Sequence, residues 1–504
     1  MTYEVILTTD RTMMSNHHGR EFLGFIATGP PIGVNEKIWM WIAAPKVKVD
    51  EEGKPVEAPY GMRKVEAKLI DAGFKAAIID PDYLHKYLDA MKVLMLGHHD
   101  FFALGPPSNE WWIITGKEPI NRVSFRRLME SPVVRKAKEK GVKIIVGGPA
   151  AWQWLYELEY WRKWGVDIVI DGEVEKIIVD IVQKALNGEP LPDYIFVGPG
   201  DSPSVEEIPV IKGASVNGLV EIMRGCPRGC KFCSVTLRPL RFIPLDIIRK
   251  EIEVNVRHGI KGTILHSEDV LLYHADGVKP RPEPLIKLHE MARKHTPGAL
   301  AWSHASLAAI KYAEDEYKLV SKLMNDIVFA DGRQSFLGVE VGIETGSPRL
   351  ARIIMPAKSA PYPPEKWPEV VEDAFRIMHE NNIIPAATII LGLPEETPED
   401  VVKTGELLDR LKPYRSIIVP MFFVPMGALK NRDWFRKNAL KPEHIDVMLK
   451  TLYHTLYWAE EIMNKFYLKE SYLLPVRMAL KLFITYVKWK VRRILPKIEA
   501  MIRR

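Results

Sequence analysis

Three cysteines are the residues of this chain whose type and spacing most directly indicate chemistry. Cys226, Cys230 and Cys233 are the only cysteines among 504 residues, and they stand in one segment, RGCPRGCKFC, with the spacing CxxxCxxC. A disulfide framework uses an even number of cysteines that are spread along the chain. Three clustered thiols instead predict one metal site, because thiolates are preferred ligands of iron–sulfur clusters and of zinc.

Two occupants of this site are considered. Three cysteines around a 4Fe–4S cluster leave one iron open to a small molecule, whereas an electron-transfer ferredoxin normally supplies a fourth cysteine, which this chain lacks. A structural zinc ion held by three cysteines and a histidine is the alternative. The position of the segment, directly after a predicted barrel strand, favours the cluster.

The elements that must position the cysteines begin at about Gly218, where apolar strands alternate with helical stretches. Six βα units in a row predict a partial (βα)6 barrel, in which chemistry lies on loops at the carboxyl ends of the strands. The cysteines fall at such an end. The predicted strands are Leu219–Met223, Gly262–His266, Leu300–Ser303, Leu337–Ile343, Ala386–Leu391 and Ser416–Phe422.

The first 186 residues also alternate apolar strands with helices. This pattern predicts a parallel, doubly wound sheet, which is a flavodoxin-like Rossmann architecture, so the fold class is α/β. The predicted strands are Val5–Thr8, Ala76–Ile79, Val93–Leu96, Lys143–Val146 and Asp167–Ile170. The predicted organisation is a Rossmann domain over 1–186, a Pro- and Gly-rich linker over 187–216, the barrel over 217–430 and a helical region over 431–504.

The pattern CxxxCxFC after the first barrel strand resembles the signature of the radical S-adenosylmethionine (SAM) superfamily. The resemblance implies that Cys226, Cys230 and Cys233 hold a 4Fe–4S cluster whose open iron binds S-adenosylmethionine. It also implies reductive cleavage of that cofactor to a 5′-deoxyadenosyl radical, with an electron donor such as ferredoxin or flavodoxin as a partner. Phe232 matches the family's aromatic position beside the adenine.

Short motifs at later strand ends extend the resemblance. The segment 267–269, Ser-Glu-Asp, stands where the family contacts the cofactor's amino group, although the commoner Gly-Gly-Glu is absent. The segment 342–346 is similar to the G-x-E-S/T-G turn, and 392–395 resembles the GLP turn. Each motif alone is also typical of an ordinary turn. The implied cofactor contacts are Phe232, Ser267, Glu268, Asp269, Gly342, Glu344, Gly392 and Pro394, and Tyr273 and His304 are the candidate catalytic contacts to substrate.

The first domain resembles the cobalamin-binding-type Rossmann domain that precedes many such barrels. Gly147, Gly148 and Gly172 follow predicted strands and are the candidate cofactor contacts, because glycine lets the backbone approach a ligand. The family's D-x-H-x-x-G, whose histidine ligates cobalt, is absent, and the nearest segment is 100–105, Asp-Phe-Phe-Ala-Leu-Gly. The sequence leaves open whether the domain binds cobalamin without that ligand or binds none.

Two other segments of the first domain carry polar side chains where a ligand could bind. The loop 8–19 follows the first strand, and the run His98-His99-Asp100 follows the third. Carboxyl ends of parallel strands border the ligand crevice of α/β sheets. The alternative for both segments is a solvated polar turn.

The carboxyl-terminal end is predicted to be a basic amphipathic helix that Pro496 kinks or interrupts. Nine basic residues stand against one acid between Val476 and Arg504, and apolar residues from Leu480 onward recur at three- and four-residue steps. Such a helix suits an anionic membrane surface. Packing on the barrel is one alternative. Nucleic acid is a third option for the helix, but no recognition module accompanies it, so no nucleic-acid partner is expected. Without a signal peptide or an apolar span, the predicted location is cytoplasmic, with peripheral contact to the inner membrane face.

The combination of domains resembles archaeal and bacterial enzymes that act on hydrophobic substrates, among them the tetraether-lipid (GDGT) ring synthases. The predicted reaction is C–C bond formation (cyclisation) or methylation at unactivated carbons of a membrane lipid or isoprenoid. One alternative is a cobalamin-dependent methyltransferase of a small molecule, tetrapyrrole or protein side chain, and another is a zinc-stabilised binding protein. The tRNA methylthiotransferases are disfavoured, because they need a second cysteine-bound cluster.

Overall fold

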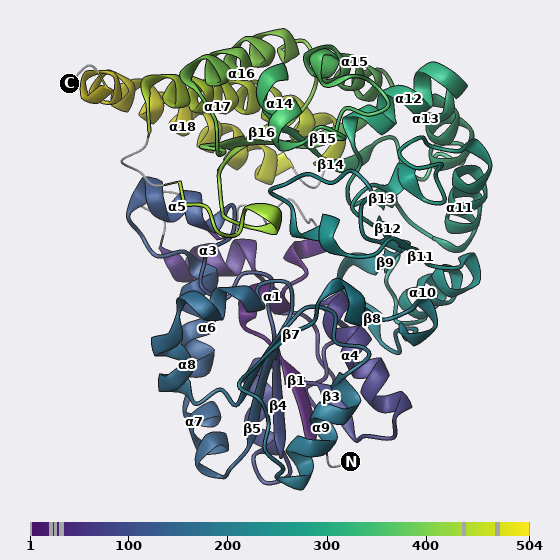
Figure 1. Ribbon diagram of the computed structural model, residues 1–504, viewed down its shortest axis with the longest axis vertical. Coiled ribbons are helices and arrows are strands. Elements are labelled where there is room, and N and C mark those ends of the chain that lie inside the picture. The colour runs from purple at the N-terminus through teal and green to yellow at the C-terminus, as the bar shows by residue number, and fades with distance from the viewer. Residues whose placement is uncertain are drawn as a thin grey trace. The chain divides into compact units, whose positions relative to one another are not determined.

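The computed structural model describes residues 3–19, 24, 28–29, 35–435, 440–468 and 474–502. The chain has an α/β fold (Figure 1) and divides into two compact units. The first unit comprises residues 1–224, 238–265 and 294–298, and the second comprises 225–237, 266–293 and 299–504. The domain boundaries predicted from the sequence stay a prediction.

The first unit is built on a six-stranded parallel sheet in the order β3-β1-β4-β5-β6-β7. The chain passes from β1 to β3 on one side and then to β4 on the other, so the order reverses at β1 and β4. Its strands are β1 (Val5–Thr8), β3 (Ala76–Ile78), β4 (Val93–Gly97), β5 (Lys143–Gly147), β6 (Ile168–Asp171) and β7 (Tyr194–Phe196). The first five confirm the predicted strands, whereas β7 lies inside the segment expected to be a linker.

Helices cover both faces of this sheet, which confirms the doubly wound architecture (Figure 1). Neighbouring residues of a strand point to opposite faces, so Ile6 of β1 packs into one apolar cluster while Val5 and Leu7 pack into the other. The helices of this unit are α1 (Arg11–Met14), α3 (Glu36–Ala43), α4 (Tyr60–Asp71), α5 (Ser108–Thr115), α6 (Ile120–Met129), α7 (Pro132–Glu139), α8 (Leu158–Trp164), α9 (Ile178–Asn187) and α10 (Leu245–Arg257).

A buried ion pair joins α4 to α10 within the first unit. Lys64 Nζ lies 2.6 Å from Glu251 Oε1, and the two side chains are 3% and 1% exposed. The Tyr60 hydroxyl donates a hydrogen bond of 2.7 Å to the same carboxylate. The unit also contains β9 (Leu219–Glu221) and two short strand pairs. In one pair, β2 (Glu57–Ala58) lies parallel to β8 (Ala214–Ser215), and in the other, β10 (Met223–Arg224) lies antiparallel to β11 (Arg241–Phe242).

The second unit contains the parallel sheet β14-β15-β16. A parallel bridge between His304 and Glu340 joins the segment after β13 to β14. With β9 and β12 (Thr263–His266), all six predicted barrel strands are confirmed. Strands of the second unit are β13 (Leu300–Trp302), β14 (Leu337–Glu344), β15 (Ile383–Leu391) and β16 (Ile417–Phe422). Its helices are α11 (Pro282–His295), α12 (Leu307–Tyr317), α13 (Leu319–Lys322), α14 (Pro348–Ile354), α15 (Trp367–Glu380), α16 (Pro398–Leu411), α17 (Pro442–Ile462) and α18 (Leu474–Ile502).

The carboxyl-terminal helix α18 differs from its prediction at one point. It runs from Leu474 to Ile502 through Pro496, so the predicted interruption is wrong, although proline donates no backbone hydrogen bond. Among the helices of the described residues, none is both long and apolar enough to span a membrane.

Candidate functional site

The three cysteines lie on one loop of the second unit, between β10 and β11. Cys230 is buried, and Cys226 and Cys233 are half-buried. The loop turns on itself, because Cys233 N donates to Cys230 O at 3.1 Å and Thr236 Oγ1 donates to Cys233 O at 2.9 Å. Burial raises the pKa of Cys226 to about 12 and that of Cys233 to about 11. Since cysteine binds metal as a thiolate, loading this site must release those protons.

Arg228 anchors the cysteine loop from within. Its Nη1 donates to three backbone oxygens, those of residues 357, 358 and 360, at 3.1, 3.0 and 2.9 Å. Its Nε lies 3.6 Å from Asp269 Oδ2, and both side chains are almost fully buried. Burial raises the pKa of Asp269, while the positive charge of Arg228 opposes that rise. The predicted cofactor residue Asp269 therefore lies against the cysteine loop.

A second buried cation, Lys358, lies near the cysteines. Its Nζ is 2.5 Å from Glu344 Oε1, and the two side chains are 12% and 7% exposed. The same Nζ lies 5.8 Å from the centre of the Phe232 ring. Desolvation lowers the pKa of Lys358, but the charges of Glu344 and Cys230 outweigh it, so the pKa is raised. The predicted residues Phe232 and Glu344 thus share one cationic neighbour that sequence reasoning missed.

The backbone at the end of β14 is strained at Glu344. This residue has φ of 61°, a left-handed conformation that is unfavourable for residues other than glycine and is concentrated at functional sites. Its carboxylate lies on Lys358 Nζ. A Cβ on Gly342 would lie 2.5 Å from Lys358 Nζ and would collide with the Glu344 carboxylate, so a side chain there would displace this ion pair.

Two other glycines are required by close packing. A Cβ on Gly427 would lie 2.6 Å from Cys233 O and 2.9 Å from Lys231 O, so only glycine lets this segment approach the cysteine loop. Gly392 has φ of 77°, and a Cβ there would collide with the Phe435 ring. Packing accounts for Gly392, and a cofactor contact by Gly392 or Pro394 stays a prediction.

Ser267 and His304 come together at the carboxyl ends of β12 and β13. Ser267 Oγ is buried and has no hydrogen-bond partner among the described residues. His304 Nδ1 lies 3.2 Å from Ser267 O, and its Nε2 lies 3.1 Å from Glu340 Oε2. Although desolvation opposes it, the hydrogen bond and charge of Glu340 raise the pKa of His304 to about 9. His304 is therefore a cation at neutral pH.

The other predicted residues of this region are less connected to the site. Tyr273 is 1% exposed, and burial raises its pKa to about 12. Glu268 is half-buried, and its charge raises the pKa values of Cys233 and His304. The catalytic roles of Tyr273 and His304 stay predictions.

The donor set fits an iron–sulfur cluster. Three thiols are present, and Arg228 and Lys358 supply positive charge beside them. In the part of the chain that the structure describes, no group of three or more His, Cys, Asp or Glu side chains is placed to hold a metal ion. The cysteines of a cluster bind different irons, so they do not converge on one point as zinc ligands do. The unpartnered Ser267 Oγ and the buried Asp269 fit a polar ligand such as S-adenosylmethionine.

In the first unit, Asp10 and His98 form a buried pair at the carboxyl ends of β1 and β4. His98 Nε2 lies 2.7 Å from Asp10 Oδ1, and neither side chain is exposed. His98 Nδ1 accepts a 2.7 Å hydrogen bond from Asp100 N, so its Nε2 carries the proton toward Asp10. Burial opposes ionisation of Asp10, but the contact with His98 and the hydrogen bonds from its neighbours, Thr12 among them, outweigh it and lower the pKa of Asp10 to about 2.

The loop 100–105 is closed by a hydrogen bond of 2.9 Å that Gly105 N donates to Asp100 Oδ1. Phe102 occupies the place of the histidine in D-x-H-x-x-G. Its ring is 1% exposed and lies 4.9 Å from the ring of Trp154, inside the apolar core. A cobalt ligand at position 102 therefore does not fit this structure.

The predicted glycines of the first unit also have packing roles. A Cβ on Gly172 would lie 2.7 Å from Val197 O, and one on Gly148 would lie 2.9 Å from His98 O, whereas Gly147 has ordinary contacts. Cofactor contacts by Gly147, Gly148 and Gly172 stay predictions. These close approaches draw the backbone after β6 against residue 197 and the backbone after β5 against His98.

Two acids after β6 bind arginines, which sequence reasoning also missed. Glu175 Oε1 lies 2.6 Å from Arg224 Nη2, and Glu173 Oε2 lies 2.7 Å from Arg241 Nη1. Arg224 stands two residues before Cys226 in the sequence. These acids therefore fix the strand pair that leads into the cysteine loop.

Residues 220–408 match the sequence model of the Radical SAM superfamily. This part of the chain is a radical SAM domain, which implies a 4Fe–4S cluster and S-adenosylmethionine as cofactors. The fold is similar to that of TsrM from Kitasatospora setae, a radical S-adenosylmethionine methyltransferase whose structure has cobalamin and a [4Fe-4S] cluster bound. That likeness has a TM-score of 0.53 and 15% identity, and it covers 84% of this chain and 75% of TsrM. A TsrM structure with tryptophan and a SAM analog gives a TM-score of 0.55.

Curated relatives are named for tRNA modification. A tRNA-2-methylthio-N(6)-dimethylallyladenosine synthase of Opitutus terrae is 27% identical over 47% of this chain and 48% of its own length. A probable threonylcarbamoyladenosine tRNA methylthiotransferase of Archaeoglobus fulgidus is 25% identical over 58% of this chain and 65% of its own length. The chain thus spans about half to two thirds of these relatives. Their names contrast with the expectation that no nucleic acid is involved, and the resemblance to tetraether-lipid ring synthases stays a prediction.

Proposed function

We propose that this protein is a cobalamin-binding radical SAM enzyme that methylates an unactivated carbon. The observation that carries the proposal is the doubly wound sheet that precedes a radical SAM domain with a three-cysteine loop. The likeness to TsrM supports it, because it covers 84% of the chain, far more than residues 220–408.

In this proposal the cluster is held by Cys226, Cys230 and Cys233. The polar end of S-adenosylmethionine is bound by Ser267 and Asp269. When bound, the cluster with S-adenosylmethionine supplies radical chemistry and cobalamin supplies a methyl group. Arg228 holds the cysteine loop against the backbone at 357–360 and keeps a positive charge beside the thiolates. His304 holds a proton beside Glu340 and can donate it toward the substrate.

The test is anaerobic reconstitution with iron, sulfide, cobalamin and a reductant. Methyl-deuterated S-adenosylmethionine is then incubated with separate lipid, small-molecule and RNA fractions, and products are analysed by mass spectrometry. We expect one bound corrinoid per chain and a trideuteromethyl mass shift in one fraction. Protein that binds no corrinoid, or that yields only 5′-deoxyadenosine with every fraction, contradicts the proposal. The variant with all three cysteines changed to alanine is the control and should show no product.

A lipid or isoprenoid substrate, modified by ring-forming C–C bond formation or by methylation, is the second candidate, and α18 favours it. Its exposed apolar residues recur at three- and four-residue steps along one side of the helix, while Ile484 on another side is 5% exposed. This stripe consists of Leu474, Met478, Leu482, Tyr486 and Trp489, which are 52%, 61%, 71%, 44% and 50% exposed. Between 474 and 493 the helix carries six basic residues and no acid. An apolar stripe flanked by cations suits an anionic lipid surface.

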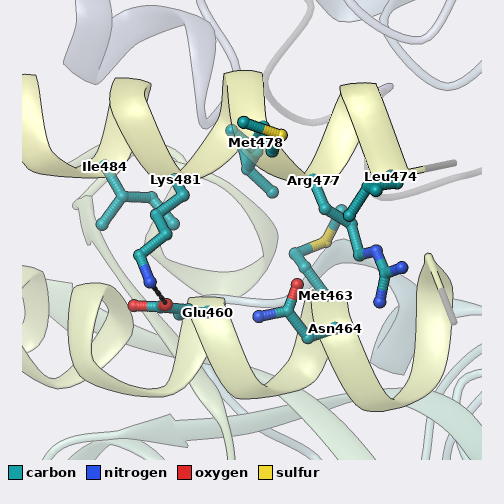
Figure 2. A pocket seen from close by; sticks show the side chains of 9 residues that line it. Glu460, Met463, Asn464, Leu474, Arg477, Met478, Lys481 and Ile484 are labelled. Carbon is teal, nitrogen blue, oxygen red and sulfur yellow. Dashed lines mark ion pairs between the residues drawn. The ribbon is translucent and has the colours of Figure 1, made fainter.

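The stripe borders a groove between α17 with its π-helical extension and α18 (Figure 2). The groove has a volume of about 320 Å³, and Leu474 and Met478 of the stripe line it. Lys481 Nζ pairs with Glu460 Oε1 at 3.2 Å across it. Apolar walls with cations at the rim match the chemistry of an anionic lipid.

Flotation with vesicles of phosphatidylglycerol and phosphatidylcholine tests this candidate. Wild-type protein should float with these vesicles, while the Leu482→Asp/Trp489→Asp variant should not. Removal of each cation should weaken binding about fivefold, since a basic residue near such a surface contributes about 1 kcal/mol. Tyr317→Asp/Val402→Asp alters exposed residues elsewhere and should bind normally. Wild-type protein that binds tRNA but no vesicle would contradict this candidate and favour a nucleic-acid partner.

A further inference from the structure

The buried pair of Lys358 and Glu344 brings two opposite charges close to the cysteine loop. Both residues and the loop belong to the second unit. Lys358 Nζ lies 2.5 Å from Glu344 Oε1, and the two side chains are almost fully buried. Buried charges are screened much less than exposed ones, so each acts on the groups around it. The proposed function assigns no role to either charge.

Lys358 is fixed beside the cysteine loop through its backbone and through its side chain. Its backbone oxygen accepts a 3.0 Å hydrogen bond from Arg228 Nη1, which comes from between the first and second cysteines. Earlier in the same segment, Ile354 O accepts a 2.9 Å hydrogen bond from Lys231 N, which lies between the second and third. The ammonium group lies 5.8 Å from the centre of the Phe232 ring, within the range of a cation–π contact. A positive charge is therefore held in place beside the sulfurs.

The carboxylate of Glu344 is fixed at both of its oxygens. Oε1 contacts Lys358 Nζ, and Oε2 accepts a 3.2 Å hydrogen bond from Thr388 Oγ1. Rotation of the carboxylate away from this position would break both contacts. The two charges also act on one thiol with opposite sign: burial raises the pKa of Cys230, the charge of Lys358 lowers it, and the charge of Glu344 raises it.

We propose that Lys358 and Glu344 set the reduction potential of the cluster that the three cysteines hold, with Lys358 favouring the reduced state and Glu344 opposing it. The potential of an iron–sulfur cluster depends on the net charge around it and on its exposure to solvent. Reduction passes one electron from a ferredoxin, a flavodoxin or a chemical reductant to the cluster, which goes from the 2+ to the 1+ state without any bond forming or breaking. A fixed cation stabilises the added negative charge, and a fixed anion destabilises it. The inference needs the radical SAM domain but neither cobalamin nor a particular substrate.

Potentiometric titration of the full, reconstituted chain, followed by electron paramagnetic resonance of the reduced cluster, tests this inference. The titration is done without S-adenosylmethionine and at pH 8, far from the ordinary pKa values of carboxyl and ammonium groups. Lys358→Met should lower the midpoint potential, and Glu344→Gln should raise it. At a fixed potential, each variant should change the ratio of reduced to oxidised cluster about tenfold, in opposite directions, which is the scale expected of a unit charge in a protein interior.

Further variants separate the effect of charge from a loss of structure. Lys358→Met/Glu344→Gln removes both charges and should bring the potential back close to that of wild type. Lys358→Arg keeps the positive charge and should also remain close to wild type. The matched control is the exposed pair of Lys287 and Glu283, whose side chains are 60% and 69% exposed. Neither Lys287→Met nor Glu283→Gln should shift the potential.

The sign of the shifts decides the outcome. Shifts of the same sign in the two single variants, or no shift in either, would overturn the inference. If Lys358→Met assembles no cluster, a potential that rises in Glu344→Gln and falls back in the double variant supports the inference, and any other result overturns it. A chain that binds its cluster but no corrinoid fails the proposed function and leaves this inference standing. Wild-type protein that assembles no cluster overturns both.

Discussion

The buried pair between Lys358 and Glu344 gives the sharpest prediction about the radical SAM site. The two side chains are 12% and 7% exposed and lie 2.5 Å apart. Removing one partner of such a pair leaves an uncompensated buried charge and typically costs about 3–5 kcal/mol. We therefore expect Lys358→Met or Glu344→Gln to lower the free energy of unfolding by about 3–5 kcal/mol each. The double variant should lose about 2 kcal/mol less than the sum, because neither charge is then stranded.

Urea unfolding of the reduced, cofactor-free chain, followed by circular dichroism, measures these free energies. The matched control is Lys287→Met, which breaks an exposed pair with Glu283 whose side chains are 60% and 69% exposed. That variant should change stability by less than about 1 kcal/mol. Losses that add in the double variant would refute the argument, since they would show that Lys358 and Glu344 stabilise the fold independently.

Three further predictions concern other buried groups. Lys64→Met should destabilise the first unit by about 3–5 kcal/mol in urea unfolding, because it strands buried Glu251; a loss below about 1 kcal/mol would contradict this. Gly427→Ala should lower the iron bound after reconstitution, whereas Gly277→Ala, with the same φ of 59° and nothing within 4 Å of its Cβ, should not; equal iron contents would disprove the packing argument. Burial lowers the pKa of His289 from 6.5 to about 4. As the pH falls, the unfolded chain therefore takes up this proton before the folded chain does, and the free energy of unfolding should fall by about 3 kcal/mol between pH 6.5 and 4. His289→Gln should flatten this dependence, and an unchanged pH profile would rule out His289 as its source.

Much of the fold could be predicted from the sequence because buried parallel strands are continuous apolar runs. The limits of β1 match the prediction, and the remaining predicted strands agree to within about three residues. The strand β7 was missed because proline and glycine on both sides make its short apolar run look like part of a loop. Its place in the sheet depends on pairing with β6, a contact that no local pattern records.

The candidate site was predictable where chemistry depends on local spacing. The cysteines and the residues at the strand ends are of this kind. Arg228 and Lys358 were not predicted, because Arg228 contacts backbone about 130 residues away and Lys358 meets Glu344 across 14 residues. Folding alone brings these groups together. The sequence did show that the cobalt-binding histidine is absent, and the structure places Phe102 there in the core.

The central claim is that three sulfurs hold a four-iron cluster with one iron left for S-adenosylmethionine. Iron and sulfide analysis of anaerobically reconstituted protein, with and without the change of Cys226, Cys230 and Cys233 to alanine, tests it most directly. We predict about four irons and four sulfides per wild-type chain, and essentially none in the triple variant. Wild-type protein that binds one zinc and no iron, or a triple variant that binds iron as wild type does, would contradict the account.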